Sequence, residues 1–306
     1  MSSPASGAVR GPSAPWLMLG SAMLFSVMAV CIKWAATLYG TGELVFYRSL
    51  VGALCIAMLA KTRGISLRTG VPAMHFWRSA SGVVAQLLWF YAITGLPLAT
   101  AMTLNYMSSV WMALFLLGGA VLLGAARADG RLVAAVLVGF AGVALVLRPT
   151  LEQQQLWFGL AGLSSGLLGA MAYLQVTALG RAGEPEIRIV FYFSIGGLTL
   201  GGLWMALQGM HTHTAQGLAL LLAIGLLATA AQILMTRAYR VGNTLSNASL
   251  QYLGIGFSFV YGVLLFDDRV TWIAAGGMLL IVAAGVQATR LRTPIDRASG
   301  SAQAKT

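Results

Sequence analysis

Apolar runs of about 20 residues, separated by short breaks that contain polar residues, Gly or Pro, form the dominant pattern of this chain. A helix of that length spans the hydrocarbon core of a bilayer. The strict alternation of apolar and polar positions that marks a membrane β-barrel does not occur. The pattern therefore predicts an all-α integral membrane protein with ten transmembrane helices. Their expected bounds are 15–38, 43–60, 71–93, 99–123, 131–147, 157–180, 187–207, 215–236, 244–266 and 270–290.

The second half of the chain weakly repeats the first half, with five apolar spans in each. The stretch that starts at Ala92 aligns with the stretch that starts at Ala238, at an offset of 146 residues, which places Asn105 opposite Gln251. Because five is an odd number, two joined copies lie in the bilayer with opposite orientations. Such inverted repeats are typical of transporters whose halves move around a central site. We therefore expect two inverted five-helix repeats around a central cavity.

The repeat also predicts the domain organisation. Two polar tails are expected to flank the two membrane repeats. The predicted segments are a tail at 1–14, a first repeat at 15–148, a second repeat at 157–290 and a tail at 291–306.

Composition and charge support this class of protein and set its orientation. Of the 306 residues, 58% are hydrophobic and 9% charged, and the mean hydropathy is +0.81, which excludes an ordinary soluble domain. The net charge of +11 comes from basic residues scattered between the spans, so nucleic-acid binding is not expected. One alternating set of loops and tails holds fourteen Lys and Arg residues, against two, Arg148 and Arg269, in the other set. Both termini are therefore predicted to be cytoplasmic, with Arg78 near the same face.

Two formal charges, Lys33 and Arg48, fall well inside predicted spans. One explanation is that both reach the outer interface and share Glu43 as a counter-ion. The other is that one or both line a water-filled cavity and attract a carboxylate or a phosphate. Both explanations remain open at this point.

All eight acidic residues fall in loops, in tails or at the ends of predicted helices. An antiporter that exchanges cationic drugs for protons is expected to have a titratable carboxylate near the middle of the membrane. The pattern therefore argues against cationic substrates and favours a facilitator. The pair His211 and His213 has no third ligand and is expected to be a solvated turn, so no metal or other cofactor is predicted. Because no nucleophile and base pair stands out, an enzyme is not expected either.

Polar and aromatic residues inside the spans are the candidates for a substrate site. Those of the first repeat fall in the outer half of the membrane and those of the second repeat in the inner half, as two gates related by an axis in the membrane plane would. The predicted substrate-binding residues are Lys33, Tyr47, Arg48, Gln86, Trp89, Tyr91, Asn105, Tyr106, Tyr173, Gln175, Gln232, Gln251 and Tyr252.

Several short motifs carry a family resemblance. They are the Ala-rich stretch after Ala92, its counterpart after Ala238, the Tyr252-Leu253 pair, the Asp267-Asp268 turn and the Ala-Gly-Val sequences at Ala141 and Ala284. From residue 16 to 290 the chain resembles the drug/metabolite transporter superfamily, in particular its ten-helix members with two EamA-type repeats. Within it, the chain is similar to YddG-like exporters of aromatic and other neutral amino acids. Where many relatives have Pro soon after the Tyr, this chain has Gly254-Ile255, so the residue that usually makes the kink is missing.

The resemblance implies a multi-pass protein of the bacterial inner membrane, surrounded by lipid and working as a monomer. It implies export of aromatic or other neutral amino acids and related small metabolites by alternating access. The alternative is a transporter of small anionic metabolites, such as phosphorylated sugars or organic acids, recruited by Lys33 and Arg48.

Overall fold

The computed structural model describes residues 13–122, 130–152 and 155–290, and every regular element in these ranges is an α-helix. The helices are α1 (Ala14–Ala35), α2 (Thr41–Thr62), α3 (Pro72–Gly95), α4 (Leu98–Tyr106), α5 (Ser108–Leu122), α6 (Gly130–Glu152), α7 (Leu156–Arg181), α8 (Glu186–Gln208), α9 (Ala215–Val241), α10 (Thr244–Leu250), α11 (Leu253–Phe266) and α12 (Trp272–Arg290).

Each predicted span overlaps one of these helices or two consecutive ones. The spans 99–123 and 244–266 are the divided ones, as α4 with α5 and α10 with α11. By length and composition, six helical segments of the described chain can cross a membrane, namely α1, α2, α7, α8, α9 and Ser246–Phe266. Shorter apolar segments lie in α6 and α12. Apart from residues 13 and 14, the predicted tails lie outside the described residues.

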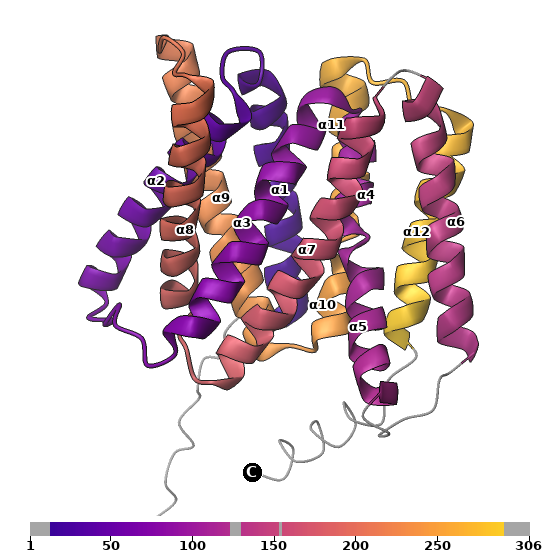
Figure 1. Ribbon diagram of the computed structural model, residues 1–306, viewed down its shortest axis with the longest axis horizontal. Coiled ribbons are helices and arrows are strands. Elements are labelled where there is room, and N and C mark those ends of the chain that lie inside the picture. The colour runs from indigo at the N-terminus through magenta and orange to yellow at the C-terminus, as the bar shows by residue number, and fades with distance from the viewer. Residues whose placement is uncertain (1–12, 123–129, 153–154, 291–306) are drawn as a thin grey trace, which may run out of the picture.

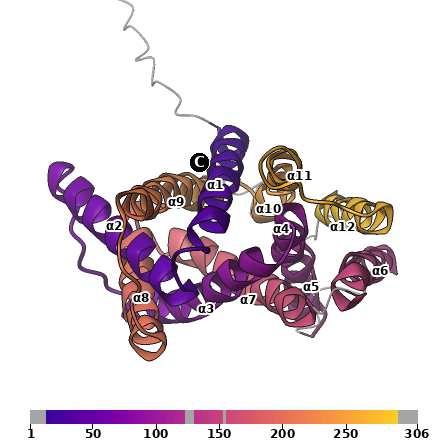
Figure 2. The ribbon, with the colours of Figure 1, turned by 90° about the horizontal axis from the view of Figure 1, so that it is seen from above.

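The helices form one bundle with an elongated cross-section. Seen from above, α2 and α8 lie at one end of it and α6 and α12 at the other (Figure 2). The most extensive contacts join α3 with α7, α2 with α8, α6 with α12, and α1 with α9. Each of these pairs joins a helix from the first half of the sequence to one from the second half, so the halves are interleaved (Figure 1).

Glycines let α6 and α12 touch along their backbones. A Cβ atom on Gly142 would lie 2.7 Å from the carbonyl oxygen of Gly277, and a Cβ atom on Gly277 would lie 2.6 Å from that of Gly142. Any side chain at either position would push the helices apart. In lipid this close fit supplies the packing energy that the hydrophobic effect does not.

Two helix breaks divide α4 from α5 and α10 from α11. At the first, Met107 N–H bonds back to the Leu104 carbonyl at 3.3 Å; at the second, Tyr252 N–H bonds back to the Ser249 carbonyl at 3.2 Å. Such i to i+3 bonds are those of a tighter 3₁₀ turn. The second break occurs in a stretch without proline, residues 246–258. Gly254 follows it, where a Cβ atom would lie 2.7 Å from Tyr106 Oη.

Candidate functional site

A cavity lined by apolar and aromatic residues and by several polar side chains lies in the interior of the bundle. Its volume is about 60 Å³, and its wall is built from α1, α2, α3, α4, α7, α8, α9 and the break between α10 and α11. Both halves of the sequence therefore contribute to one cavity. Eight predicted site residues line it: Arg48, Gln86, Trp89, Asn105, Tyr106, Tyr173, Gln232 and Gln251.

Residues that the sequence alignment of the two halves pairs with each other line this cavity together. Gln86 and Gln232 stand 146 positions apart, as do Asn105 and Gln251, and all four line the wall. The offset is the one at which the two halves of the sequence align. The cavity therefore lies where the two halves present corresponding faces.

Several buried polar atoms of the wall lack a hydrogen-bond partner within the described chain. They are both amide atoms of Gln86, the indole Nε1 of Trp89 and Oε1 of Gln251. By contrast, Asn105 Nδ2 donates to Ser165 Oγ at 2.9 Å. Buried polar groups are almost always hydrogen-bonded, so these unpaired donors and acceptors are available to whatever occupies the cavity.

Aromatic rings form much of the remaining wall. Trp89 meets Phe25 edge to face at 6.2 Å between ring centres, and Tyr173 stacks on Tyr239 at 5.3 Å and 14° between ring planes. These contacts orient the rings before a ligand arrives. An apolar, aromatic cavity with a few convergent polar groups is typical of a small-molecule site.

Arg78 is a cavity residue that the sequence analysis did not include. It was placed near the cytoplasmic face, whereas its side chain is 2% exposed and lines the cavity. The sequence spacing could have identified it. Arg78, Gln86 and Trp89 are separated by eight and three residues, which places them on one face of α3.

Lys33 lies away from the cavity wall in an ion pair. Its Nζ contacts Asp268 Oδ1 at 2.7 Å and Oδ2 at 3.0 Å, and Asp268 Oδ2 also accepts a bond from Leu98 N–H at 2.7 Å. The expectation that Glu43 would be the counter-ion is therefore wrong. Glu43 instead accepts bonds from the backbone N–H and the ring Nδ1 of His211.

The two histidines of the α8–α9 loop are also more constrained than a solvated turn. His213 contacts Tyr47 Oη at 2.8 Å through Nε2 and Tyr39 Oη at 3.2 Å through Nδ1. With the bonds between His211 and Glu43, they tie this loop to the start of α2 and to the α1–α2 connection. Tyr47 is thus part of this closure and does not line the cavity.

The remaining three predicted site residues also lie off the cavity wall. Tyr91 is 39% exposed and stacks on Phe158 at 4.6 Å between ring centres. Gln175 accepts a hydrogen bond from Ser81 Oγ at 3.1 Å. Tyr252 is buried in the hydrophobic core at the second helix break.

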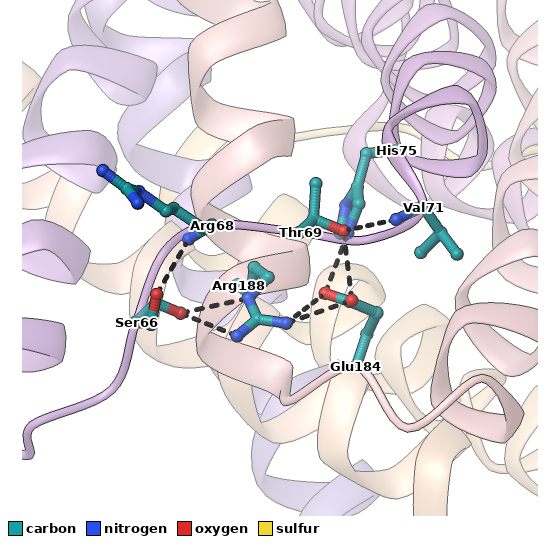
Figure 3. Close-up of polar contacts among 7 residues, drawn as sticks. All are labelled: Ser66, Arg68, Thr69, Val71, His75, Glu184 and Arg188. Atoms are coloured by element: carbon teal, nitrogen blue, oxygen red, sulfur yellow. Dashed lines mark hydrogen bonds and ion pairs between the residues drawn. The ribbon is translucent and has the colours of Figure 1, made fainter.

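A carboxylate also ties the two halves together at the opposite end of the bundle. Glu184, between α7 and α8, accepts bonds of 3.0 Å from Thr69, His75 and Arg188 (Figure 3). Arg188 Nη2 in turn donates to the Ser66 carbonyl at 2.8 Å. Burial raises the pKa of the Glu184 carboxyl, but the hydrogen bonds from His75, Arg188 and Thr69 outweigh burial and hold that pKa below its ordinary value.

An all-helical bundle with membrane-length apolar helices and an aromatic interior cavity that holds a few polar groups is typical of a membrane protein that handles a small molecule. Residues 12–148 match the sequence model of the EamA-like transporter family. The pseudopaline exporter CntI of Pseudomonas aeruginosa (strain UCBPP-PA14) is 32% identical over 263 residues, which make up 85% of this chain and 90% of the exporter. The chain belongs to the EamA-like transporter family, within the drug/metabolite transporter superfamily.

More distant proteins match most of the chain. The riboflavin transporter of Rhizobium johnstonii (strain DSM 114642 / LMG 32736 / 3841) is 25% identical, covering 89% of this chain and 88% of its own length. Human solute carrier family 35 member G1 is 23% identical, covering 88% of this chain and 76% of its own. One solved crystal structure superposes with a TM-score of 0.66 at 18% identity, over 91% of this chain and 96% of that chain, which shows the fold. The family and these relatives indicate a membrane transporter of small metabolites rather than an enzyme.

Proposed function

We propose that this transporter exports aromatic or other neutral amino acids, and metabolites built like them, by alternating access. The observation that carries the proposal is the combination of buried, unpaired amide groups and aromatic rings in one cavity wall. The amides and the indole N–H of Trp89 can pair with the ammonium and carboxylate groups of a zwitterion, and the rings can stack on its side chain. The relative named as a pseudopaline exporter supports the direction of transport.

The arrangement of helices supports alternating access by two inverted five-helix repeats, with ten spans in all. In such a fold α1 corresponds to α7 and α3 to α9, while α2 corresponds to α8 and α6 to α12. An axis in the membrane plane would turn the α1–α9 contact into the α7–α3 contact, and would map the α2–α8 and α6–α12 contacts onto themselves. These four contacts are the most extensive ones in the bundle. The inverted repeat thus gives each half the same means of closing one side of the cavity.

The distribution of Lys and Arg supports an inner-membrane protein with both termini in the cytoplasm. Under this orientation the Glu184 links close the cytoplasmic side and the Glu43 and Asp268 links close the outer side. None of the described residues along the cavity wall is Asp or Glu, which supports a facilitator driven by the substrate gradient. The wall is complete within one chain, which supports a monomer as the transporting unit.

The experiment uses the purified full chain in liposomes loaded with labelled L-phenylalanine, L-tryptophan or L-glutamine. We expect saturable efflux that exceeds the efflux from loaded liposomes without protein. Replacing Gln86 by Leu should slow this efflux, because it removes an unpaired amide from the cavity wall. The matched variant Gln175→Leu should retain it, since Gln175 bonds Ser81 away from the cavity. Equal efflux from loaded protein-free liposomes across the panel would refute the proposal.

Small organic acids are the second candidate substrates, because Arg48 lines the cavity as a buried cation. The pairing of Lys33 with Asp268 makes Arg48 the stronger anion-binding residue of the two originally considered. Arg48→Gln should therefore reduce transport of an organic acid such as succinate more than Lys33→Gln does. The reverse order would argue that Lys33, and not Arg48, recruits anions.

A further inference from the structure

Two arginines from neighbouring helices converge on the cavity. Arg48 comes from α2 and Arg78 from α3, and both are almost fully buried, at 6% and 2% exposure. Their guanidinium carbons lie 5.1 Å and 4.3 Å from the ring centre of Phe193, on α8. The two charges therefore cannot be farther apart than the sum of these distances, and one aromatic ring holds both.

None of the described residues along the cavity wall balances the charge of this pair. Arg48 Nε and both Arg78 Nε and Nη1 are buried without a hydrogen-bond partner. The Arg48 guanidinium donates a long hydrogen bond of 3.4 Å from Nη2 to Gln232 Oε1, and this acceptor is uncharged. No carboxylate lies among the described residues of the cavity wall. Two like charges buried side by side raise the free energy of the empty site, and a ligand of opposite charge would relieve this cost.

The local sequence is adapted to seat the second arginine. Arg78 Nη1 lies over Gly82, one turn further along α3, and a Cβ atom at position 82 would overlap it and lie 3.1 Å from Phe193 Cε2. Glycine therefore provides the space that lets Arg78 lie beside Phe193. The Arg78 head group is held at the cavity wall rather than extended toward the end of the bundle.

We propose that Arg48 and Arg78 together bind a substrate that carries two negative charges, in the form of two carboxylates. Each guanidinium pairs with one carboxylate, and the aromatic and amide wall around Trp89 and Gln86 holds the rest of the molecule. This proposal rests on the proposed function and deepens it. An amino acid with one carboxylate fills half of the charged site, so the preferred cargo is a dicarboxylic, amino-acid-like metabolite.

The test compares probes that differ in one carboxylate. Binding to the purified full chain in nanodiscs is measured as a concentration-dependent rise in melting temperature, because a ligand that binds the folded state stabilises it. The pairs are L-glutamate with L-glutamine, and isophthalate with benzoate. We expect the dicarboxylate of each pair to bind about tenfold more tightly or better, as a charge-assisted hydrogen bond contributes. Inorganic phosphate and glucose 6-phosphate are measured in the same assay, to test whether the two arginines prefer a phosphate group to two carboxylates.

Variants then assign the effect to the two arginines. Arg48→Gln and Arg78→Gln should each bring the glutamate-to-glutamine affinity ratio close to one, because each variant leaves one guanidinium for the α-carboxylate that both probes carry. The control Arg63→Gln removes one exposed positive charge outside the cavity and should leave the ratio unchanged. The comparison on the unaltered protein stands by itself if a variant fails to fold.

Four outcomes contradict the proposal in different ways. Equal affinity for both members of each pair overturns the two-carboxylate site while leaving the proposed function intact. A ratio that survives Arg78→Gln overturns the assignment of Arg78. If the phosphate probes bind more tightly than the dicarboxylates, the preferred ligand is a phosphate and the two-carboxylate proposal is wrong. Absence of binding by every probe, the neutral amino acids included, overturns the proposed function together with this inference.

Discussion

The ion pair between Lys33 and Asp268 should contribute about 1–3 kcal/mol to folding stability. Asp268 accepts two bonds from Lys33 and one from the N–H of Leu98, and the two paired side chains are 18% and 11% exposed. Removing one partner of a fully buried pair costs about 3–5 kcal/mol, whereas an exposed pair contributes about 0.2–1 kcal/mol. The intermediate exposure places this pair between the two values.

A double-mutant cycle measures this energy. Lys33→Met keeps the length and the apolar stem of the side chain, and Asp268→Asn keeps an oxygen that can accept from Leu98 N–H. Each single variant should be destabilised, and the double variant should lose less than the sum of the two. Unfolding of the purified chain in mixed micelles, followed by tryptophan fluorescence, gives the free energies. The exposed Arg240–Glu186 pair, changed to Met and Gln, is the matched control and should couple by less than about 1 kcal/mol.

Two results would refute this reasoning about Lys33. A coupling energy below about 0.5 kcal/mol would mean that the pair contributes no more than a surface contact. Loss of substrate binding in Lys33→Met at unchanged stability would mean that Lys33 contacts the substrate, as the sequence pattern predicts.

Three further predictions concern other parts of the molecule. Gly82→Ala should displace the Arg78 head group and reduce dicarboxylate binding about tenfold in the nanodisc assay, and unchanged affinity would contradict the seating role of Gly82. Trp89→Leu should weaken binding of aromatic amino acids severalfold, while Tyr91→Leu, outside the cavity, should not; equal losses would contradict this placement. Because the pKa of Glu184 is lower in the folded than in the unfolded chain, its contribution to stability should be complete above about pH 4.3 and be lost as the pH falls through the folded pKa. Melting temperatures measured against pH should show this loss, and Glu184→Gln should remove that part of the dependence; an identical profile in the variant would contradict it.

The helical period explains which candidate residues the sequence could identify. Gln86 and Trp89 were recognisable because polar and aromatic groups stand out in an apolar span, and both line the cavity. Tyr91 follows two positions after Trp89, which is about 200° around the helix, so it contacts Phe158 instead. Arg78 was missed because its depth was counted from the helix end, while its face of α3 was not considered.

Contacts between distant segments could not be predicted from any local rule. The partner of Lys33 is 235 positions away, beyond a turn whose position depends on how α11 packs. The helix breaks at Met107 and at Gln251 carry no proline, so they too depend on tertiary packing. Apolar runs predicted where the helices lie because bilayer thickness fixes their length, but the divisions within two spans are not encoded by that length.

The pair of arginines around Phe193 gives the substrate site an electrical property. An empty site that carries two positive charges responds to the membrane potential, at about 2.3 kcal/mol for each charge that crosses 100 mV. With the cytoplasm negative, this force favours the empty site facing the cytoplasm, where cargo is loaded. Two carboxylates offset the charge of the two guanidiniums, so the loaded carrier, which keeps only the charge of the cargo's ammonium group, is biased less than the empty one. Export of such an anion would therefore draw on the membrane voltage, without a proton or sodium ion crossing in exchange.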